Sequence, residues 1–255
     1  MGVTVCTGWH PAAWSEYART FVETFARHWP ASVNLVAYTE EPAPMPRGEC
    51  RSLWGIPGAR EFYERHKDNP VSCGTGPHRN WLPKDHRRGH SWRFDAVRFF
   101  KQLIIPLDAS LALPDDDILV WLDADVVTFA EVPEGFVEKL LGRADLCYLG
   151  RNKGSEIGFW AVRLNKRTRP FLANISSLYL DDRFTSLEQT HSAWVWDYAR
   201  RGSGMIMKDL TPGGRDHVFV DIRCPLHVCL DHAKGARKKL GHSPEHPLRW
   251  WEKKA

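Results

Sequence analysis

The chain has 255 residues and a formal net charge of +4, and 43% of its residues are hydrophobic and 26% charged. This balance is typical of a soluble globular protein that is long enough to bury a large core, and the length fits one domain over residues 1–255. The apolar run at 118–122 is far shorter than the roughly 20 residues of a membrane helix, so we expect no membrane span.

The N-terminus and the cysteines favour a cytoplasmic protein. The first residues, MGVTVCTGWHP, lack the basic start and apolar core of a signal peptide. None of the six cysteines belongs to a Cys-x-x-Cys pair, so neither a zinc ribbon nor a redox motif is indicated. We therefore expect reduced, mostly structural thiols and a cytoplasmic location.

The predicted elements open with a β-α-β unit. A strand is predicted at Val3–Cys6, a helix from Pro11 to about His28, and a second strand at Val33–Tyr38. This order implies a parallel sheet that binds ligands at the carboxyl ends of its strands. Residues 40–92, rich in Pro, Gly, His and Arg, show little periodicity and are predicted to form a loop-rich insertion.

The next predicted helix covers residues 94–105 and is apolar around most of its circumference. Asp95, Arg98 and Gln102 form its polar stripe, whereas Lys101 lies on the apolar side. An ammonium group there either reaches an anionic partner or is carried to the surface by its alkyl stem. The later predicted elements, in chain order, are strands at 118–122, 144–149 and 158–164, helices at 168–180 and 187–200, and a strand at 205–210.

Positive charge is concentrated in two segments. Residues 79–93 hold five lysines and arginines against Asp85, and the basic C-terminal extension at 232–255 holds seven against Glu245 and Glu252. Such clusters are either solvated surface or attract the phosphates of a nucleotide or a nucleic acid. A non-enzymatic nucleic-acid-binding module would account for these segments, but not for the acidic residues described next.

The stretch VWLDADVV, residues 120–127, places two aspartates directly after an apolar strand. Asp123 and Asp125 would share a face, because strand side chains two residues apart point the same way. Two such carboxylates repel each other unless a cation or a shared proton stabilises them. One alternative is a haloacid-dehalogenase-type phosphatase with Asp123 as nucleophile, whose second acidic pair is matched only by Asp181 and Asp182.

A hydrophobic strand that runs into Asp-x-Asp resembles the metal-binding motif of GT-A glycosyltransferases. Downstream, HAKGARK spells His-x-x-Gly-x-x-Lys with His232, Gly235 and Lys238. It resembles the C-terminal motif of the retaining family that includes glycogenin and bacterial galactosyltransferases, although Lys239 and Leu240 replace the usual Pro-Trp. The resemblance implies a single-domain α/β fold with a Rossmann-like mixed sheet flanked by helices.

The same resemblance assigns the metal and the donor. It implies that Asp123 and Asp125, which are also catalytic candidates, hold Mn²⁺ or Mg²⁺ together with His232. In the family the cation bridges the two phosphates of a nucleotide-sugar donor, so the resemblance implies such a donor here, which we expect to be a UDP-sugar, and a cation that would neutralise the departing diphosphate. Gly235 would let the backbone approach the diphosphate, and Lys238 would neutralise it.

Further donor contacts are predicted from the helix and from the first two strands. Arg98 and Lys101 resemble the helix residues that reach the donor diphosphate and sugar in this family. Thr7 and Tyr38 end the first two predicted strands. They are candidates for contacts to the base and the ribose, or else ordinary strand-end residues.

The acceptor side is assigned by position in the same family. Glu156, in SEIGF, replaces the Asn of the family's Asn-x-Gly, and His191 and Ser192 are the nearest equivalents of its acceptor-side Asp-Gln pair. Glu156, His191 and Asp197 are therefore catalytic candidates for sugar or acceptor contacts. The resemblance favours retaining, front-face transfer without a dedicated base, whereas an inverting enzyme needs a carboxylate aimed at the acceptor hydroxyl.

The segments RFDAVRFFKQ, EIGFWAVRLN and DHAKGARK also resemble small single-domain glycosyltransferases of bacteriophages. This resemblance implies a hydroxymethylated base in phage DNA as the acceptor, with a glycan as the other choice, and the host cytoplasm as the location if a phage encodes the chain. Residues 79–93, which include Trp81 and Trp92, would then contact the DNA backbone and an unstacked base, or else cover the donor as a lid. The sequence predicts no oligomeric state.

Overall fold

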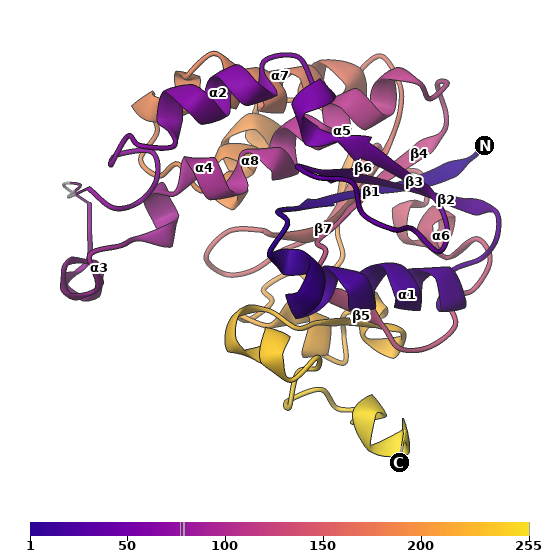
Figure 1. Cartoon of the computed structure of the whole chain (residues 1–255). Coiled ribbons are helices and arrows are strands. Elements are labelled where there is room, and N and C mark those ends of the chain that lie inside the picture. Colours follow the sequence, from indigo (N-terminus) through magenta and orange to yellow (C-terminus); the bar gives the residue numbers. More distant parts are fainter. Residues whose placement is uncertain (77, 79, 255) are drawn as a thin grey trace.

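A mixed β-sheet forms the centre of the molecule in the computed structural model, which describes residues 1–76, 78 and 80–254 (Figure 1). Its strands among these residues are β1 (Val3–Trp9), β2 (Val33–Thr39), β3 (Glu49–Ser52), β4 (Ile118–Leu122), β6 (Leu146–Leu149), β7 (Glu156–Arg163) and β8 (Met207–Asp209). They are ordered β3-β2-β1-β4-β7-β6-β8. The first four run parallel, and β7 is antiparallel to both β4 and β6. The start of β7 therefore lies at the same sheet edge as the carboxyl end of β4.

Helices cover both faces of this sheet (Figure 1). Those on one face are α2 (Ala59–His66), α4 (Ala96–Phe99), α5 (Lys101–Leu111), α7 (Thr168–Leu180) and α8 (Ser192–Arg201). The other face is covered by α1 (Arg19–His28), which follows a π-helix at Trp14–Ala18, and by α6 (Phe136–Leu141). A short helix, α3 (Pro83–Arg88), projects from one end of the molecule (Figure 1).

The two faces of the sheet bury separate hydrophobic cores. Val120 and Leu122 join the core on the side of α1 and α6, whereas Leu119 and Trp121 join the core on the side of α5 and α7. All four side chains are almost completely buried. A strand covered on both faces can be apolar throughout, which explains the uninterrupted run ILVWL in β4. Two aspartates directly after such a strand are unusual and call for a chemical explanation.

A second, two-stranded sheet connects the C-terminal segment to the centre. Here β5 (Val126–Thr128) pairs antiparallel with β9 (Leu230–His232). Further along the chain, the indole of Trp250 stacks on Phe129 with ring centroids 5.2 Å apart and donates to Asp231 Oδ2 at 3.0 Å. The C-terminal segment is therefore packed against the body of the protein, and β9 ends beside the aspartates that follow β4.

The prediction of an α/β domain with a mixed sheet flanked by helices is confirmed. The helix predicted at 168–180 is α7 itself, and the helix predicted at 94–105 is observed as α4 and α5. Within residues 40–92, which the sequence predicts to be loop-rich, the structure forms β3, α2 and α3. None of the helices formed by the described residues combines the length and the hydropathy needed to cross a membrane.

Candidate metal centre

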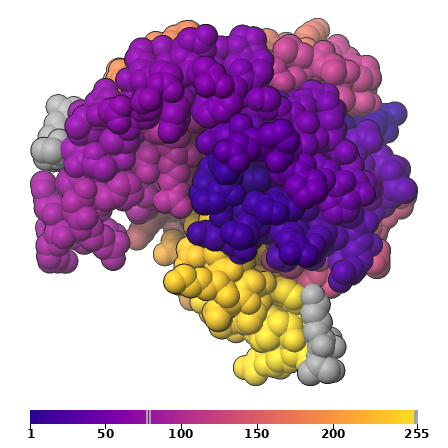
Figure 2. All heavy atoms as spheres, viewed as in Figure 1, coloured from indigo at the N-terminus to yellow at the C-terminus, as the bar shows by residue number. Residues whose placement is uncertain are grey.

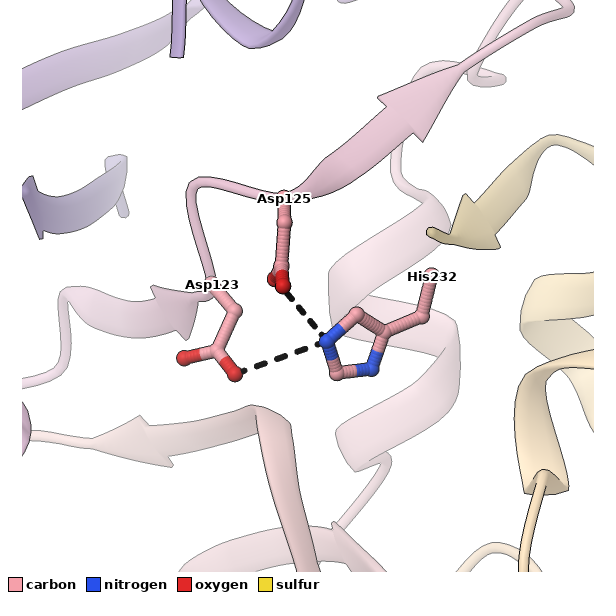
Figure 3. Close-up of side chains that lie close together, drawn as sticks. All are labelled: Asp123, Asp125 and His232. Carbon is pink, nitrogen blue, oxygen red and sulfur yellow. Dashed lines mark hydrogen bonds and ion pairs between the residues drawn. The ribbon is translucent and has the colours of Figure 1, made fainter. Parts of the chain in front are cut away.

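Asp123, Asp125 and His232 converge at the carboxyl end of β4 (Figure 3). The two aspartates lie between β4 and β5, and the histidine is the last residue of β9. His232 Nε2 lies 2.9 Å from Asp125 Oδ1 and 3.6 Å from Asp123 Oδ2. One ligand atom from each residue lies within 4.8 Å of the others, and no other such cluster of His, Cys, Asp or Glu occurs in the described residues. The structure thus brings together the three residues predicted as metal ligands.

Two hydrogen bonds hold the carboxylate of Asp123 on one side. Its Oδ1 accepts from Gln102 Nε2 of α5 and from Trp121 Nε1 of β4, each at 2.8 Å, while Oδ2 faces His232. Burial, reinforced by the charge of Asp125, raises the pKa of Asp123 to about 6. A cation at Oδ2 would therefore relieve an unfavourable buried charge.

Asp125 has a cationic partner on each oxygen. Oδ1 faces His232, and Oδ2 lies 3.0 Å from Lys238 Nζ, which also stands 3.9 Å from the ring centroid of Tyr17. Burial opposes the charge of Asp125, but His232 and Lys238 outweigh burial and hold the pKa of this carboxyl below its usual range. Burial likewise opposes the charge of His232, yet Asp125 raises the pKa of the imidazole. Cations of the protein thus stabilise the carboxylate of Asp125, whereas the carboxylate of Asp123 remains an unfavourable buried charge.

Gly158 in β7 leaves the space that the imidazole of His232 occupies. A β-carbon added at Gly158 would lie 2.6 Å from His232 Cε1 and 2.9 Å from Nδ1. The backbone is also used, because the carbonyl of Gly158 accepts from the amide of Asp123 at 2.9 Å. Only glycine lets β7 pass this close to the histidine. The sequence-based site does not include Gly158, since a strand pattern does not show what packs against a glycine.

Glu156 begins β7 and is buried beside two cations. Its Oε2 accepts from Lys234 Nζ at 2.6 Å and from Arg151 at 3.1 Å. Burial opposes ionisation, but Lys234 and His232 outweigh burial and lower the pKa of Glu156 to about 2. The carboxylate is therefore charged and paired, which makes it a weak base. Lys234 is a residue that sequence reasoning missed, because the pattern His-x-x-Gly-x-x-Lys does not include it.

Asp197 of α8 holds the loop that leads into β7. Its Oδ2 accepts from the amide of Ser155 and its Oδ1 from the hydroxyl of the same residue, both at 2.8 Å. Oδ1 also accepts from Arg200 Nε at 2.6 Å. Both oxygens are used inside the protein, so the observed role of Asp197 is to position the residue that precedes Glu156. Its contact with sugar or acceptor stays a prediction.

His191 caps the N-terminus of α8 and is enclosed by aromatic rings. Its Nδ1 accepts from the amide of Ala193 at 3.1 Å, and its ring centroid lies 4.3 Å from that of Phe99 and 4.7 Å from that of Trp92. Burial, together with the charge of Lys234, lowers the pKa of His191 to about 3. The imidazole is therefore neutral at pH 7 and carries its proton on Nε2.

Lys101 and Arg98, predicted to reach the donor diphosphate, differ in their surroundings. Lys101 is buried, and its Nζ donates to Glu40 Oε1 at 3.1 Å, so its ammonium reaches an anionic group, the first of the two alternatives for this position. Burial lowers the pKa of Lys101, an effect that Glu40 opposes. Arg98 is exposed, and its guanidinium stands over the ring of Phe99 at 5.5 Å.

Thr7 and Tyr38 lie in β1 and β2, as predicted from the first two strands. Thr7 is fully buried. Tyr38 is also buried and donates its hydroxyl to Asp108 Oδ2 of α5 at 2.7 Å. These positions agree with ordinary strand residues, and base and ribose contacts by Thr7 and Tyr38 stay predictions.

Gly235, from the predicted diphosphate motif, and Asp182, from the phosphatase alternative, lie in different surroundings. Gly235 has a φ of +64°, a conformation that favours glycine, in the segment that carries Lys238 to Asp125. Asp182 instead pairs with His66 at 2.7 Å and with an arginine of α2 at 2.9 Å. It takes no part in the Asp-Asp-His cluster, and the described residues place no second acidic pair there. The geometry therefore gives no support to the phosphatase alternative.

The ligand set of this centre suits a hard divalent cation. Two carboxylates favour Mg²⁺ or Mn²⁺, and the Nε2 of His232 becomes a ligand when it loses its proton. Because Lys238 contacts Asp125 Oδ2, a cation that used this oxygen would have to share or displace the ammonium. The fold and the site together define an α/β protein with a candidate metal centre at the carboxyl end of its central strand.

No protein-family model and no curated protein matches the sequence. The solved structures with a similar fold include three glycosyltransferases. Mouse xyloside xylosyltransferase 1 is 11% identical, with 82% of this chain and 85% of that chain covered and a TM-score of 0.47. A glycosyltransferase involved in glycosylation of the major capsid of PBCV-1 is 13% identical, with coverages of 94% and 98% and a TM-score of 0.49. The Streptococcus pneumoniae TIGR4 glycosyltransferase GlyE is 12% identical, with 82% of this chain but only 45% of GlyE covered and a TM-score of 0.45.

Proposed function

We propose that this chain is a metal-dependent glycosyltransferase that moves a sugar from a nucleotide-diphosphate sugar, a UDP-sugar, to an acceptor hydroxyl. The observation that carries the proposal is the cluster of Asp123, Asp125 and His232, with Lys238 against the second aspartate. Departure of a nucleoside diphosphate creates negative charge, which a divalent cation and the ammonium of Lys238 can neutralise together. A metal at this centre, Mn²⁺ or Mg²⁺, would supply that charge neutralisation when bound.

Residues of the chain would perform the other steps. Lys238 would exchange the carboxylate of Asp125 for a phosphate of the donor, and Gly235 would let the backbone come close to the same group. Glu156 is a weak base because Lys234 and Arg151 pair with it. This pairing supports retaining, front-face transfer over inversion, which requires a basic carboxylate at the acceptor hydroxyl.

The first experiment is donor hydrolysis by the full-length chain with a panel of nucleotide sugars. We expect release of UDP from a UDP-sugar in the presence of Mn²⁺, loss of this release with EDTA, and recovery when Mn²⁺ is added in excess. ADP-sugars and GDP-sugars serve as matched donors and are expected to turn over more slowly. If no nucleotide sugar gives turnover or raises the melting temperature with Mn²⁺ present, the proposal is wrong.

The acceptor that we propose is DNA with a hydroxymethylated base, and α3 provides the first support. Lys84, Arg87 and Arg88 are exposed on this helix, and none of the three forms an ion pair among the described residues. The one acid of α3, Asp85, is buried and pairs with Arg93 at 3.1 Å. Figure 2 shows α3 standing out from the body, beside a hollow bordered on its other side by the C-terminal segment. Arg79, predicted as part of this basic segment, lies outside the described residues.

An exposed aromatic ring near the candidate site provides the second support. Trp92 is 46% exposed and stands edge to face with His191, whereas Trp81 is buried against His86 and is not available for stacking. Exposed cations attract a phosphate backbone, and an exposed indole can stack on an unpaired base. A neutral glycan acceptor would use the indole but not the cations, so charge complementarity favours DNA over a glycan.

Reversing the charge of Lys84, Arg87 and Arg88 together to glutamate is expected to weaken DNA binding at least tenfold at low salt. The slope of log affinity for single-stranded DNA against log salt should become shallower by about 0.7 for each phosphate that the protein no longer neutralises. Fluorescence anisotropy with a single-stranded oligonucleotide measures both quantities, and UDP release from the donor should be unchanged. The matched control reverses Arg143, Lys166 and Arg201, which are exposed elsewhere. Equal effects of the two triple variants would contradict a DNA surface at α3.

A further inference from the structure

A chain of hydrogen bonds links helix α8 to the candidate metal centre. Ser192, in the first turn of α8, donates its hydroxyl to Gln102 Oε1 of α5, and Gln102 Nε2 donates to Asp123 Oδ1 at 2.8 Å. Ser192 is fully buried and Gln102 is half-buried. Neither Gln102 nor Ser192 belongs to the predicted set of metal ligands, and the sequence connects Ser192 only with the acceptor side, as a positional equivalent of the family's Asp-Gln pair.

The orientation of the Gln102 amide follows from its two neighbours. A carboxylate only accepts hydrogen bonds, so the NH₂ group must face Asp123 and the carbonyl oxygen must face Ser192. The serine hydroxyl can rotate to donate to that oxygen. The reverse orientation would set the carbonyl oxygen against the carboxylate of Asp123, a repulsive contact in a buried site. The hydroxyl of Ser192 therefore donates to Gln102, and the amide NH₂ of Gln102 donates to Asp123.

These hydrogen bonds determine which oxygen of Asp123 is available to a cation. Oδ1 is occupied by Gln102 and by Trp121, and this leaves Oδ2 on the side of His232. The indole of Trp121 is fixed in the core, but a glutamine side chain has several rotatable bonds and needs a second contact to stay in place. Ser192 supplies that contact from an element 90 residues away in the chain.

We infer that Gln102 is a positioning residue that orients Asp123 for metal binding, and that Ser192 acts on the metal centre through Gln102. This inference rests on the proposed metal-dependent function. Partners that orient a ligand typically change metal affinity 10–100-fold when removed. The inference also predicts that substitutions of Gln102 and Ser192 do not have independent effects on metal affinity. When Gln102 is replaced, no hydrogen bonds connect Ser192 to Asp123.

The experiment titrates Mn²⁺ into the full-length chain without nucleotide and follows free Mn²⁺ by electron paramagnetic resonance. Gln102→Met, which keeps the length of the side chain, is expected to raise the Kd for Mn²⁺ about 10–100-fold. Ser192→Ala is expected to raise it about threefold to tenfold, an order-of-magnitude range below that of the direct partner. The double variant should match Gln102→Met alone.

Ser110→Ala is the matched control, because Ser110 is an equally buried serine whose hydroxyl bonds to a backbone carbonyl of α5. It should leave the Kd for Mn²⁺ unchanged. Melting temperatures in EDTA separate a folding defect from a metal-binding defect, and Ser192→Ala keeps the test informative if Gln102→Met unfolds. A Kd for Gln102→Met within twofold of the unmodified chain, or additive effects in the double variant, would overturn the inference. Absence of Mn²⁺ binding by the unmodified chain would instead refute the metal-dependent function, and the inference with it.

Discussion

Replacement of Asp125 by asparagine is expected to lower kcat/KM for donor hydrolysis about 10³-fold, which corresponds to about 4 kcal/mol of transition-state stabilisation. Asp125 is the acidic partner of both His232 and Lys238, so the change removes a negative charge between two cations. Without this charge the centre loses a ligand that divalent cations favour. The Kd for Mn²⁺ should rise together with the loss of turnover.

The measurement pairs steady-state UDP release with Mn²⁺ titration of the same variant. Asp115→Asn is the charge-matched control, because Asp115 is exposed and pairs with Arg169 away from the candidate centre. The control should retain the activity and metal affinity of the unmodified chain. If Asp125→Asn keeps both, the metal centre is wrongly assigned even if the chain proves to be a glycosyltransferase.

The sequence predicts those helices and strands whose burial shows in a local pattern of apolar residues. The run ILVWL predicts β4 because a strand covered on both faces is apolar throughout, and the apolar period from Thr168 to Leu180 predicts α7 without error in its bounds. The helix predicted at 94–105 continues to Leu111, through Pro106. Proline removes a helix hydrogen bond, but Pro106 is buried in the core, where packing compensates for that loss.

The elements within residues 40–92 depend on contacts that no local pattern reveals. The helix α2 has only eight residues, and its buried ring, Phe62, packs against Phe100 and Tyr179 at centroid distances of 4.7 and 5.8 Å. A helix this short is not stable on its own and forms because of such packing. The edge strand β3 is partly exposed and polar, so it lacks the alternation of a half-buried strand.

The residues of the candidate site likewise include some that the sequence predicts and others that only the fold reveals. Asp123, Asp125 and His232 were predicted because each belongs to a motif whose spacing has a chemical reason. Gln102 and Gly158 were not predicted as site residues, although Gly158 matches the glycine of Asn-x-Gly, since their importance lies in contacts across the fold. Gln102 meets Asp123 from a neighbouring helix, and Gly158 matters for the ring that would collide with a β-carbon.

Gly158→Ala is expected to abolish metal binding with only a moderate loss of stability. The new methyl group would lie 2.6 Å from His232 Cε1, a distance that real β-carbons do not reach, so the imidazole or the strand must move. Overpacking of a buried site costs about 1–3 kcal/mol, which a domain of this size tolerates. A shift of about 1 Å in one ligand is enough to lower turnover about 10²-fold or more.

The measurements for Gly158→Ala are the Kd for Mn²⁺, UDP release and the free energy of unfolding in urea. Gly202→Ala is the matched control, because a β-carbon at Gly202 meets no atom within 4 Å and its φ of −99° suits alanine. The control should change none of the three quantities appreciably. The decisive comparison is between stability and metal affinity: if Gly158→Ala loses stability but binds Mn²⁺ as tightly as the unmodified chain, then the metal centre does not require this glycine. If it loses metal affinity far beyond its loss of stability, the glycine is required by the metal centre and not by the sheet.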